Sequence, residues 1–362
     1  MGTPVASSDP SAAELPARAS RRHRLATYLR RRPVLCLFLL TPGIVEYTSG
    51  SSSFVFLVVS PAWFFLALGI NAAMYTSGAL LVREALIRWN KGWPTVLALG
   101  SAYAIMEEGI ADQTIFNPHT SPIGAAGTYG HWAGVNWLWV PDILVIHVLM
   151  SLYVPILLLG YALPETRGKS LLSLGQIRIV VGLLAADTAL LTAIVSTHLQ
   201  YWYGLPLLLA SVVAIVGLIA LGWKLPKEIA WRRGGPPTAS RRQFFLVGCI
   251  AYPALVLVAD VGASAGLPPV VVFAAIVAIT FGVLSWILRN VGTQGFERHV
   301  VAFSAGLLAL GLVLGILFEF PWEFVLLADA AVVYFLWWLD RDLARRSLPS
   351  QIGTIAPSGV PA

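Results

Sequence analysis

Two adjacent glutamates, Glu107 and Glu108, close an apolar stretch of the chain and have the chemistry to act on water. Carboxylates at membrane depth are rare, and they usually face a bundle interior or a water-filled cavity. Two neighbouring carboxylates repel each other when both are ionised, so one of the pair is expected to hold a proton near neutral pH. Such a carboxylate can serve as a general base toward water. The alternative is that the pair marks a membrane interface and stays solvated.

A histidine in the middle of a later apolar stretch is the second candidate group. Ser151 follows His147 by four residues, so the two share one face of a helix. We expect His147 to orient water or to stabilise an oxyanion, and Asn117 in the preceding loop to assist. His198, which ends the next apolar stretch, is a further candidate. The competing interpretations are a neutral His147 bonded to a neighbouring helix and a His198 exposed at a membrane interface.

The spacing of potential metal ligands predicts neither a metal nor a cofactor. Histidine and carboxylate side chains are common ligands of Zn²⁺. However, the chain contains no His-x-x-x-His and no Glu-x-x-His spacing. Its two cysteines, Cys36 and Cys249, are too few for a disulfide scaffold or a thiolate cluster.

The Glu-Glu pair at the end of an apolar helix, followed by histidines on later spans, resembles the CAAX-protease and bacteriocin-processing family of intramembrane proteases. That family typically has Glu-Glu-x-x-x-Arg, then Phe-x-x-x-His, then His-x-x-x-Asn. In this chain the first motif begins at Glu107 and ends in Asp112 where the family has Arg. Ile143 stands where the family has Phe, and Trp202 stands where it has Asn.

The resemblance covers at most residues 93–203 and implies a reaction as well as a fold. In the family, the glutamates and histidines activate water against a peptide bond. The resemblance therefore implies an intramembrane hydrolase that acts on a membrane peptide. The residues that carry over by position are Glu107, Glu108, His147 and His198.

The elements that must position these residues can be inferred from the distribution of positive charge. Every Lys and Arg falls into one of six clusters, and the five stretches between the clusters are long and apolar. A membrane crossing needs about 20 apolar residues, so each stretch can hold a helical hairpin. Positive residues stay on the cytoplasmic side, so all clusters are expected there. The fold predicted is an all-α polytopic integral membrane bundle of about ten transmembrane helices with both termini cytoplasmic.

The ten predicted spans follow from these five stretches. The first is short, is interrupted by Pro42 and Gly43, and carries Glu46. The approximate ranges are 33–47, 54–82, 93–110, 137–163, 176–197, 204–223, 243–262, 268–288, 299–318 and 322–339. The connection between the third and fourth spans, residues 111–136, is the longest on the outer side, and long connections in compact proteins are often functional.

Composition agrees with a membrane protein. The chain is 57% hydrophobic and 12% charged, whereas about 25% charged residues are usual in a soluble domain. The net charge of +6 lies beside apolar spans, where it favours anionic lipid headgroups over nucleic acid. The expected surroundings are the lipid bilayer of a bacterial plasma membrane. Residues 1–32 and 343–362 are expected to be disordered cytoplasmic tails that flank a helical domain at 33–342.

Three other functions remain open. The first is a transporter coupled to protons or small cations, with Glu107, Glu108, His147 and Asp187 as relay groups. In its favour, residues 164–169 resemble a cytoplasmic motif of sugar-type transporters, although a polar turn also explains them. The second is a lipid-linked glycosyltransferase, which uses acidic residues on the outer face but usually has a large first outer loop. The third is a membrane protein without catalytic activity.

Overall fold

The computed structural model describes residues 28–47, 54–119, 128–228, 234–318 and 322–347. Most of the two predicted tails, at 1–27 and 348–362, lies outside these ranges. At the carboxyl end, helix α13 continues to Ser347, so the helical domain extends beyond the predicted boundary at residue 342.

The described chain is almost entirely helical. A two-stranded antiparallel hairpin, β1 (His131–Trp132) and β2 (Val135–Asn136), lies in the predicted outer loop. The helices are α2 (Pro33–Pro42), η1 (Gly43–Tyr47), α3 (Val55–Val59), α4 (Pro61–Arg88), α5 (Trp93–Ala104), η2 (Ile105–Ala111), α6 (Trp139–Ile146), η4 (His147–Tyr153), α7 (Val154–Ala162), η5 (Pro164–Thr166), α8 (Leu174–Leu199), α9 (Gly204–Lys224), α10 (Arg241–Ser264), α11 (Pro269–Asn290), α12 (Glu297–Phe318) and α13 (Trp322–Ser347).

Eight helical stretches among the described residues are long and apolar enough to cross a membrane. They confirm the prediction of an all-α protein with membrane-spanning helices. The other two predicted spans fall on α2 with η1 and on α5 with η2, which are also helical. The predicted second span differs in detail, because the chain breaks at Ser60 between α3 and α4.

Local sequence explains where several of these helices begin. Ser173 and Gln176 form a reciprocal capping box at the start of α8, and Ser240 and Gln243 form one at the start of α10. Each box satisfies backbone N–H groups that the first helical turn leaves without partners. Proline also stands in the first turn of α4, α5 and α11, where its missing N–H costs nothing.

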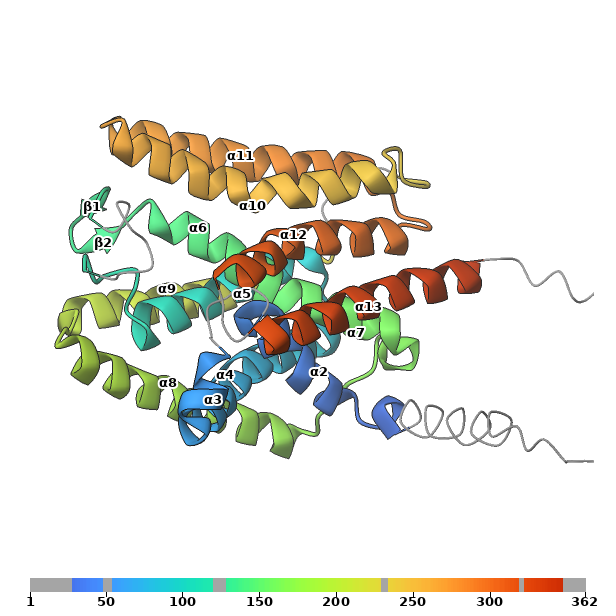
Figure 1. Cartoon of the computed structure of the whole chain (residues 1–362), viewed down its shortest axis with the longest axis horizontal. Helices are drawn as coiled ribbons and strands as arrows, with labels where there is room; N and C mark the ends of the chain where they lie inside the picture. The colour runs from blue at the N-terminus through green and yellow to red at the C-terminus, as the bar shows by residue number, and fades with distance from the viewer. Residues whose placement is uncertain (1–27, 48–53, 120–127, 229–233, 319–321, 348–362) are drawn as a thin grey trace, which may run out of the picture.

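The ends of the helices that carry Lys and Arg gather at one end of the bundle. Figure 1 shows that α2 begins and α13 ends at one end, and that the β1–β2 hairpin lies at the other. Lys91 after α4 donates to the carbonyl of Leu225 after α9 (2.7 Å), and Lys227 donates to Asn90 (2.8 Å). We call this end of the bundle the basic end.

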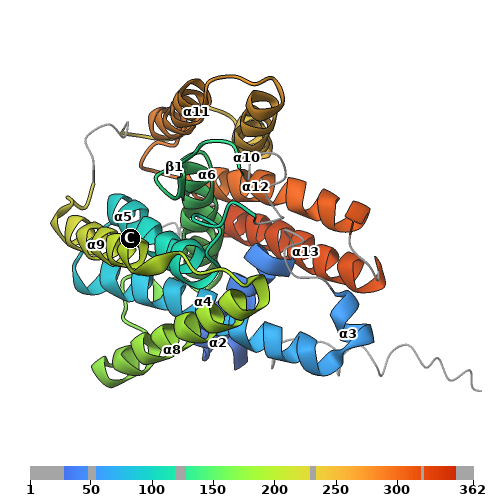
Figure 2. The same cartoon turned by 90° about the vertical axis from the view of Figure 1, so that its left-hand side faces the viewer.

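Further contacts tie α10, α12 and α13 together at the basic end. Arg298 on α12 donates to both carboxylate oxygens of Asp340 on α13, at 2.8 and 2.6 Å. Arg241 on α10 lies 3.4 Å from the same carboxylate. Figure 2 looks along the bundle and shows α6 in the interior, with α5 and α9 on one side and α12 and α13 on the other.

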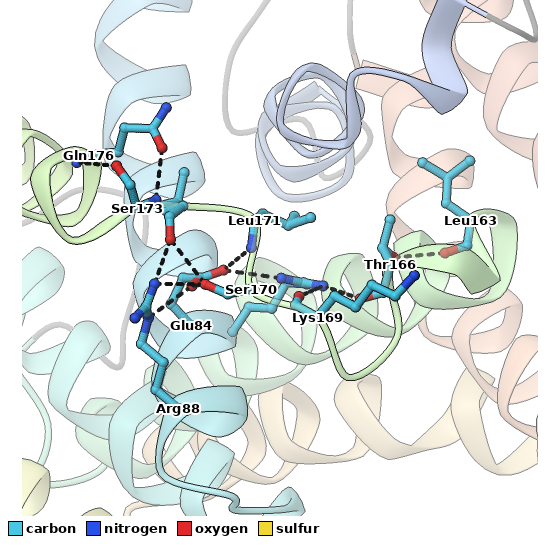
Figure 3. A network of polar contacts seen from close by, with 11 residues as sticks. Glu84, Arg88, Leu163, Thr166, Lys169, Ser170, Leu171, Ser173 and Gln176 are labelled. Carbon is cyan, nitrogen blue, oxygen red and sulfur yellow. Dashed lines mark hydrogen bonds and ion pairs between the residues drawn. The ribbon is translucent and has the colours of Figure 1, made fainter.

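A buried carboxylate fastens the turn after α7 to helix α4 (Figure 3). Glu84 is 2% exposed and accepts hydrogen bonds from Ser170 Oγ and from the backbone N–H of Leu171. Arg88 lies 3.2 Å from the same carboxylate and donates to Ser170 Oγ at 2.7 Å. Arg83 donates to the carbonyl oxygens of Thr166 and Lys169, inside the segment that resembles a transporter motif. These contacts give residues 164–169 a structural role as an anchored turn.

Candidate functional site

Two π-helical segments carry three of the residues that the sequence singles out, Glu107, Glu108 and His147. η2 continues α5 and contains Glu107 and Glu108, while η4 continues α6 and begins at His147. In such segments the hydrogen bonds run from residue i to residue i+5, as in the 2.8 Å bond from Asp112 N to Glu107 O. π-Helical turns inside α-helices are rare and frequently occur at functional sites.

Close packing between α5 and η4 brings the two segments together. Gly100 on α5 lies directly against η4: a Cβ atom at this position would come within 2.8 Å of Val148 Cγ2 and 3.2 Å of Val148 Cα. Only glycine permits this separation without displacing η4. One helical turn and a half further along, α5 becomes η2 and the two glutamates reach η4.

His147 lies between the two glutamates. Its Nε2 atom is 2.9 Å from Glu108 Oε1, and its Nδ1 atom is 2.9 Å from Glu107 Oε2. All three residues are buried, with exposed fractions of 3%, 9% and 1% for His147, Glu108 and Glu107. An imidazole in this position can exchange a proton with either carboxylate, because each ring nitrogen faces one of them.

Ser151 bears on which of the two contacts of His147, with Glu107 or with Glu108, is a hydrogen bond. Its Oγ atom lies 3.0 Å from His147 Nδ1, one turn along η4. If the serine hydroxyl donates to Nδ1, then Nε2 carries the proton and donates to Glu108. Glu107 Oε2 then accepts no hydrogen bond from the described residues, although Nδ1 is near it. Ser151 is completely buried and is not among the residues that line the cavity beside Glu107, so it contacts the imidazole from within the protein interior.

The second carboxylate oxygen of Glu108 also accepts a hydrogen bond. Thr114 donates to Glu108 Oε2, and Trp139 Nε1 donates to Thr114 Oγ1 at 2.9 Å. This chain of bonds connects η2 to the start of α6. Because His147 and Thr114 occupy both oxygens of its carboxylate, Glu108 is fixed within the protein interior.

Glu107 opens onto a cavity of about 300 Å³. The cavity lies among η1, α3, α4, η2 and α8, and Glu108 and His147 are behind its wall. Its lining consists of three carboxylates, one amide and eight apolar or aromatic residues: Glu46, Glu107, Asp112, Asn71, Tyr47, Phe56, Trp63, Phe64, Ala67, Met74, Tyr75 and Leu191. Ligand sites of small molecules typically measure about 300–1,000 Å³, so this cavity is at the lower end of that range.

Asp112 lies on the same cavity wall as Glu107. In a regular α-helix, residues four apart share a face, so the sequence predicts that Asp112 lies beside Glu108. The structure adds a relationship to Glu107: the backbone N–H of Asp112 bonds to the carbonyl of Glu107, and both side chains line the cavity. The cavity therefore has two carboxyl groups on one helical turn.

Glu46 is a cavity residue that the sequence did not identify as part of the site. It accepts hydrogen bonds from Tyr75 Oη and from Asn71 Nδ2 (3.4 Å), both on α4. The sequence feature that could have identified Glu46 is its carboxylate in the short apolar helix at 33–47. Tyr75 and Asn71 could not be recognised in this way, because a tyrosine or an asparagine in a long helix has many structural uses.

The other two predicted site residues lie apart from this centre. His198 is exposed in the last turn of α8, and among the described residues no hydrogen bond or ion pair joins it to Glu107, Glu108 or His147. Asn117 is buried, and its Oδ1 atom accepts a 2.9 Å bond from the backbone N–H of His119. Neither residue lines the cavity.

The charge of the cavity is strongly negative. Three carboxylates line it, and its lining includes neither Lys nor Arg. His147 behind the wall is the nearest side chain that can become cationic. Within the described ranges, no three His, Cys, Asp or Glu side chains are grouped as a metal ion would require. The arrangement can accept a proton from water at Glu107, deliver one from Asp112, and attract a cationic group.

Comparison of the chain with protein-family models, with curated proteins and with solved structures finds no match.

Proposed function

We propose that the protein is a glutamate-dependent intramembrane hydrolase that cleaves a peptide bond in a membrane-associated substrate. One observation carries the proposal: His147 lies 2.9 Å from both Glu107 and Glu108, and of the two glutamates only Glu107 faces the cavity. A carboxylate held beside an imidazole at the edge of a cavity suits general-base activation of water. The resemblance to the CAAX-protease and bacteriocin-processing family supports the same reaction.

The cavity residues suggest how the proton would move. Glu107 takes a proton from a water molecule, and the resulting hydroxide attacks the carbonyl carbon of the peptide bond. Asp112, in its protonated form, then gives a proton to the leaving nitrogen as the C–N bond breaks. Finally, the proton on Glu107 passes through the cavity to Asp112, which restores both carboxyl groups to their starting states. Two carboxyl groups that divide the acid and base roles in this way form a recurring arrangement in hydrolases.

The test compares cells that produce the wild-type protein with cells that produce the Glu107→Gln variant at the same level. New peptide N-termini in the membrane fraction are mapped by mass spectrometry. We expect a set of N-termini present with the wild type and absent with the variant. The matched control is Glu323→Gln, which changes an exposed glutamate at the start of α13 and is expected to leave the set intact. Identical sets for the wild type and Glu107→Gln would contradict the proposal.

Coupled transport of protons or small cations is the second candidate. It is favoured by further buried carboxylates in the bundle: Asp187 on α8 is 8% exposed and Asp329 on α13 is 6% exposed, and each has carboxylate oxygen without a hydrogen bond from the described residues. Such groups mark proton relays in transporters. Proteoliposomes that contain the wild-type protein and a pH-sensitive dye distinguish the two functions. A pH change that Asp187→Asn abolishes would favour transport over hydrolysis.

For the membrane topology, we propose that all ten helical segments cross a bacterial plasma membrane with the basic end in the cytoplasm. Clustering of Lys and Arg at one end of the bundle supports this orientation. The test places single cysteines at Trp132 and Thr293 in a protein whose Cys36 and Cys249 are changed to serine. We expect an impermeant maleimide to label intact cells at position 132 only. Labelling at position 293 only would reverse the orientation.

A further inference from the structure

The cavity has two unlike walls. The first, which contains Glu107 and Asp112, comes from η2 and is the wall assigned to the reaction. The second comes from η1, α3 and the first half of α4. We call it the aromatic wall, and its residues are Glu46, Tyr47, Phe56, Trp63 and Phe64.

The aromatic residues of this wall differ in how exposed they are. Tyr47 and Phe64 are each 8% exposed, and their ring centroids are 5.8 Å apart at an interplanar angle of 56°. Phe56 and Trp63, in the same lining, are 41% and 45% exposed. The faces of aromatic rings attract cations, and groups of such rings around a pocket are the usual receptors for ammonium ions.

A carboxylate lines the cavity together with these rings. Glu46 directly precedes Tyr47, and two groups on α4, Tyr75 Oη and Asn71 Nδ2, hold its carboxylate in place. The cavity lining has no Lys or Arg, and the neighbouring segment 48–53 has none in its sequence. A cation that enters the cavity would thus meet a carboxylate and several aromatic side chains together.

The opposite wall is also acidic. Glu107 is 1% exposed, and its Oε2 atom, which lies 2.9 Å from His147 Nδ1, accepts no hydrogen bond from the described residues. Burial of a carboxylate is costly unless it is paired and hydrogen-bonded. A positive group inside the cavity would reduce this cost at Glu46 and Glu107 together.

From these features we infer that the cavity binds an organic ammonium group, and that the hydrolase substrate carries a lysine-type side chain beside the bond that is cleaved. The statement that the lysine-type side chain lies beside the cleaved bond rests on the proposed function. The ammonium site itself does not. The butylammonium chain of lysine is small enough for a cavity of about 300 Å³. Its methylene groups would lie along the aromatic wall, and its ammonium group would bind Glu46.

The binding test uses two small probes that differ in charge but little in shape. These are N-acetyl-lysine methylamide and its neutral analogue, N-acetyl-norleucine methylamide. Saturation-transfer NMR measures the binding of each probe to the full-length protein in nanodiscs, with empty nanodiscs as the blank. We expect the lysine probe to bind at least about tenfold more tightly than the norleucine probe.

Three variants and one matched control locate the site and separate it from catalysis. Glu46→Gln is expected to weaken lysine-probe binding about tenfold, and Trp63→Leu several-fold, because the first removes a charge and the second a ring face. The matched control is Trp202→Leu, which removes an exposed tryptophan outside the cavity and should leave binding unchanged. Asp112→Asn is expected to retain binding even where it reduces cleavage, so the hydrolase function and the ammonium site can fail independently.

Equal binding of the two probes, or no binding of either, would overturn the inference and would mean that protons alone neutralise the cavity carboxylates. Lysine-selective binding that survives both Glu46→Gln and Trp63→Leu would also overturn it, since the cation would then bind elsewhere.

Discussion

The backbone N–H of Asp112 donates a 2.8 Å hydrogen bond to the carbonyl oxygen of Glu107, and both side chains line the same cavity. This i to i+5 bond belongs to a π-helical turn, which brings together two carboxyl groups that an α-helix would separate. A base and an acid on one turn have fixed relative positions. The proposed division of roles between Glu107 and Asp112 follows from this local backbone geometry.

Substitution of Asp112 by asparagine tests the role of the general acid. General acid catalysis contributes about 10²–10⁴-fold to rate, so cleavage of the native peptide bond should fall by a factor in this range. An ester of a nitrophenol in place of that peptide bond needs no proton on its leaving group, so its hydrolysis should be nearly unaffected. Both rates are measured on the same purified variant. Equal losses for the amide and the ester would show that Asp112 is not the acid.

Ser151 offers a different reading of the centre, because Ser151, His147 and Glu108 form a continuous series of hydrogen bonds. A serine nucleophile activated by histidine would follow the same order of groups. Ser151 is completely buried, however, so we expect Ser151→Ala to slow turnover about tenfold without abolishing it. Complete loss of activity, together with covalent labelling of wild-type Ser151 by a fluorophosphonate, would instead establish a nucleophile.

The approach of α5 to η4 at Gly100 can be tested by adding a side chain. Gly100→Leu would force its Cβ atom against Val148, and overpacking of this kind costs about 1–3 kcal/mol. We expect a lower unfolding temperature and a loss of cleavage activity. Gly217→Leu on α9 is the matched control, because a Cβ atom there meets nothing within 4 Å. Similar unfolding temperatures for both variants would show that the close approach does not position the site.

The anchored turn at the basic end predicts a change in stability that is separate from the site. Removing one member of a buried ionic network costs about 3–5 kcal/mol, so Glu84→Ala should lower the unfolding temperature strongly. Glu165→Ala removes an exposed carboxylate from the same turn and should have little effect. Thermal unfolding in detergent measures both variants. A Glu84→Ala protein as stable as the Glu165→Ala protein would mean that water replaces the lost contacts.

Long-range features of the fold could be predicted from the sequence because they depend on charge and hydropathy over many residues. The absence of Lys and Arg from five long stretches located the helices and the basic end. A carboxylate pair at the end of an apolar stretch is costly enough to stand out, and so is a histidine inside one. Glu107, Glu108 and His147 were found for that reason, and they come together in the structure.

The rest of the site depends on features that single residues do not reveal. No residue pattern marks the change from α- to π-helix at Ile105, so Asp112 could not be identified from the sequence as a cavity residue beside Glu107. Tyr75 and Asn71 acquire their roles only through the packing of α4 against η1, since their partner Glu46 is more than 20 residues away in the chain. His198 satisfied a motif spacing, yet it lies at an exposed helix end.

The most direct test of the central claim uses the substrate identified from the N-termini that are present with the wild type and absent with Glu107→Gln. The rate at which purified protein cleaves this substrate is measured in H₂¹⁸O. The account predicts one ¹⁸O atom in the new carboxylate and a loss of about 10³-fold or more for Glu107→Gln. Glu108→Gln, which retains a side chain able to bond His147 and Thr114, should lose considerably less. Equal rates for the wild type and Glu107→Gln would contradict the account.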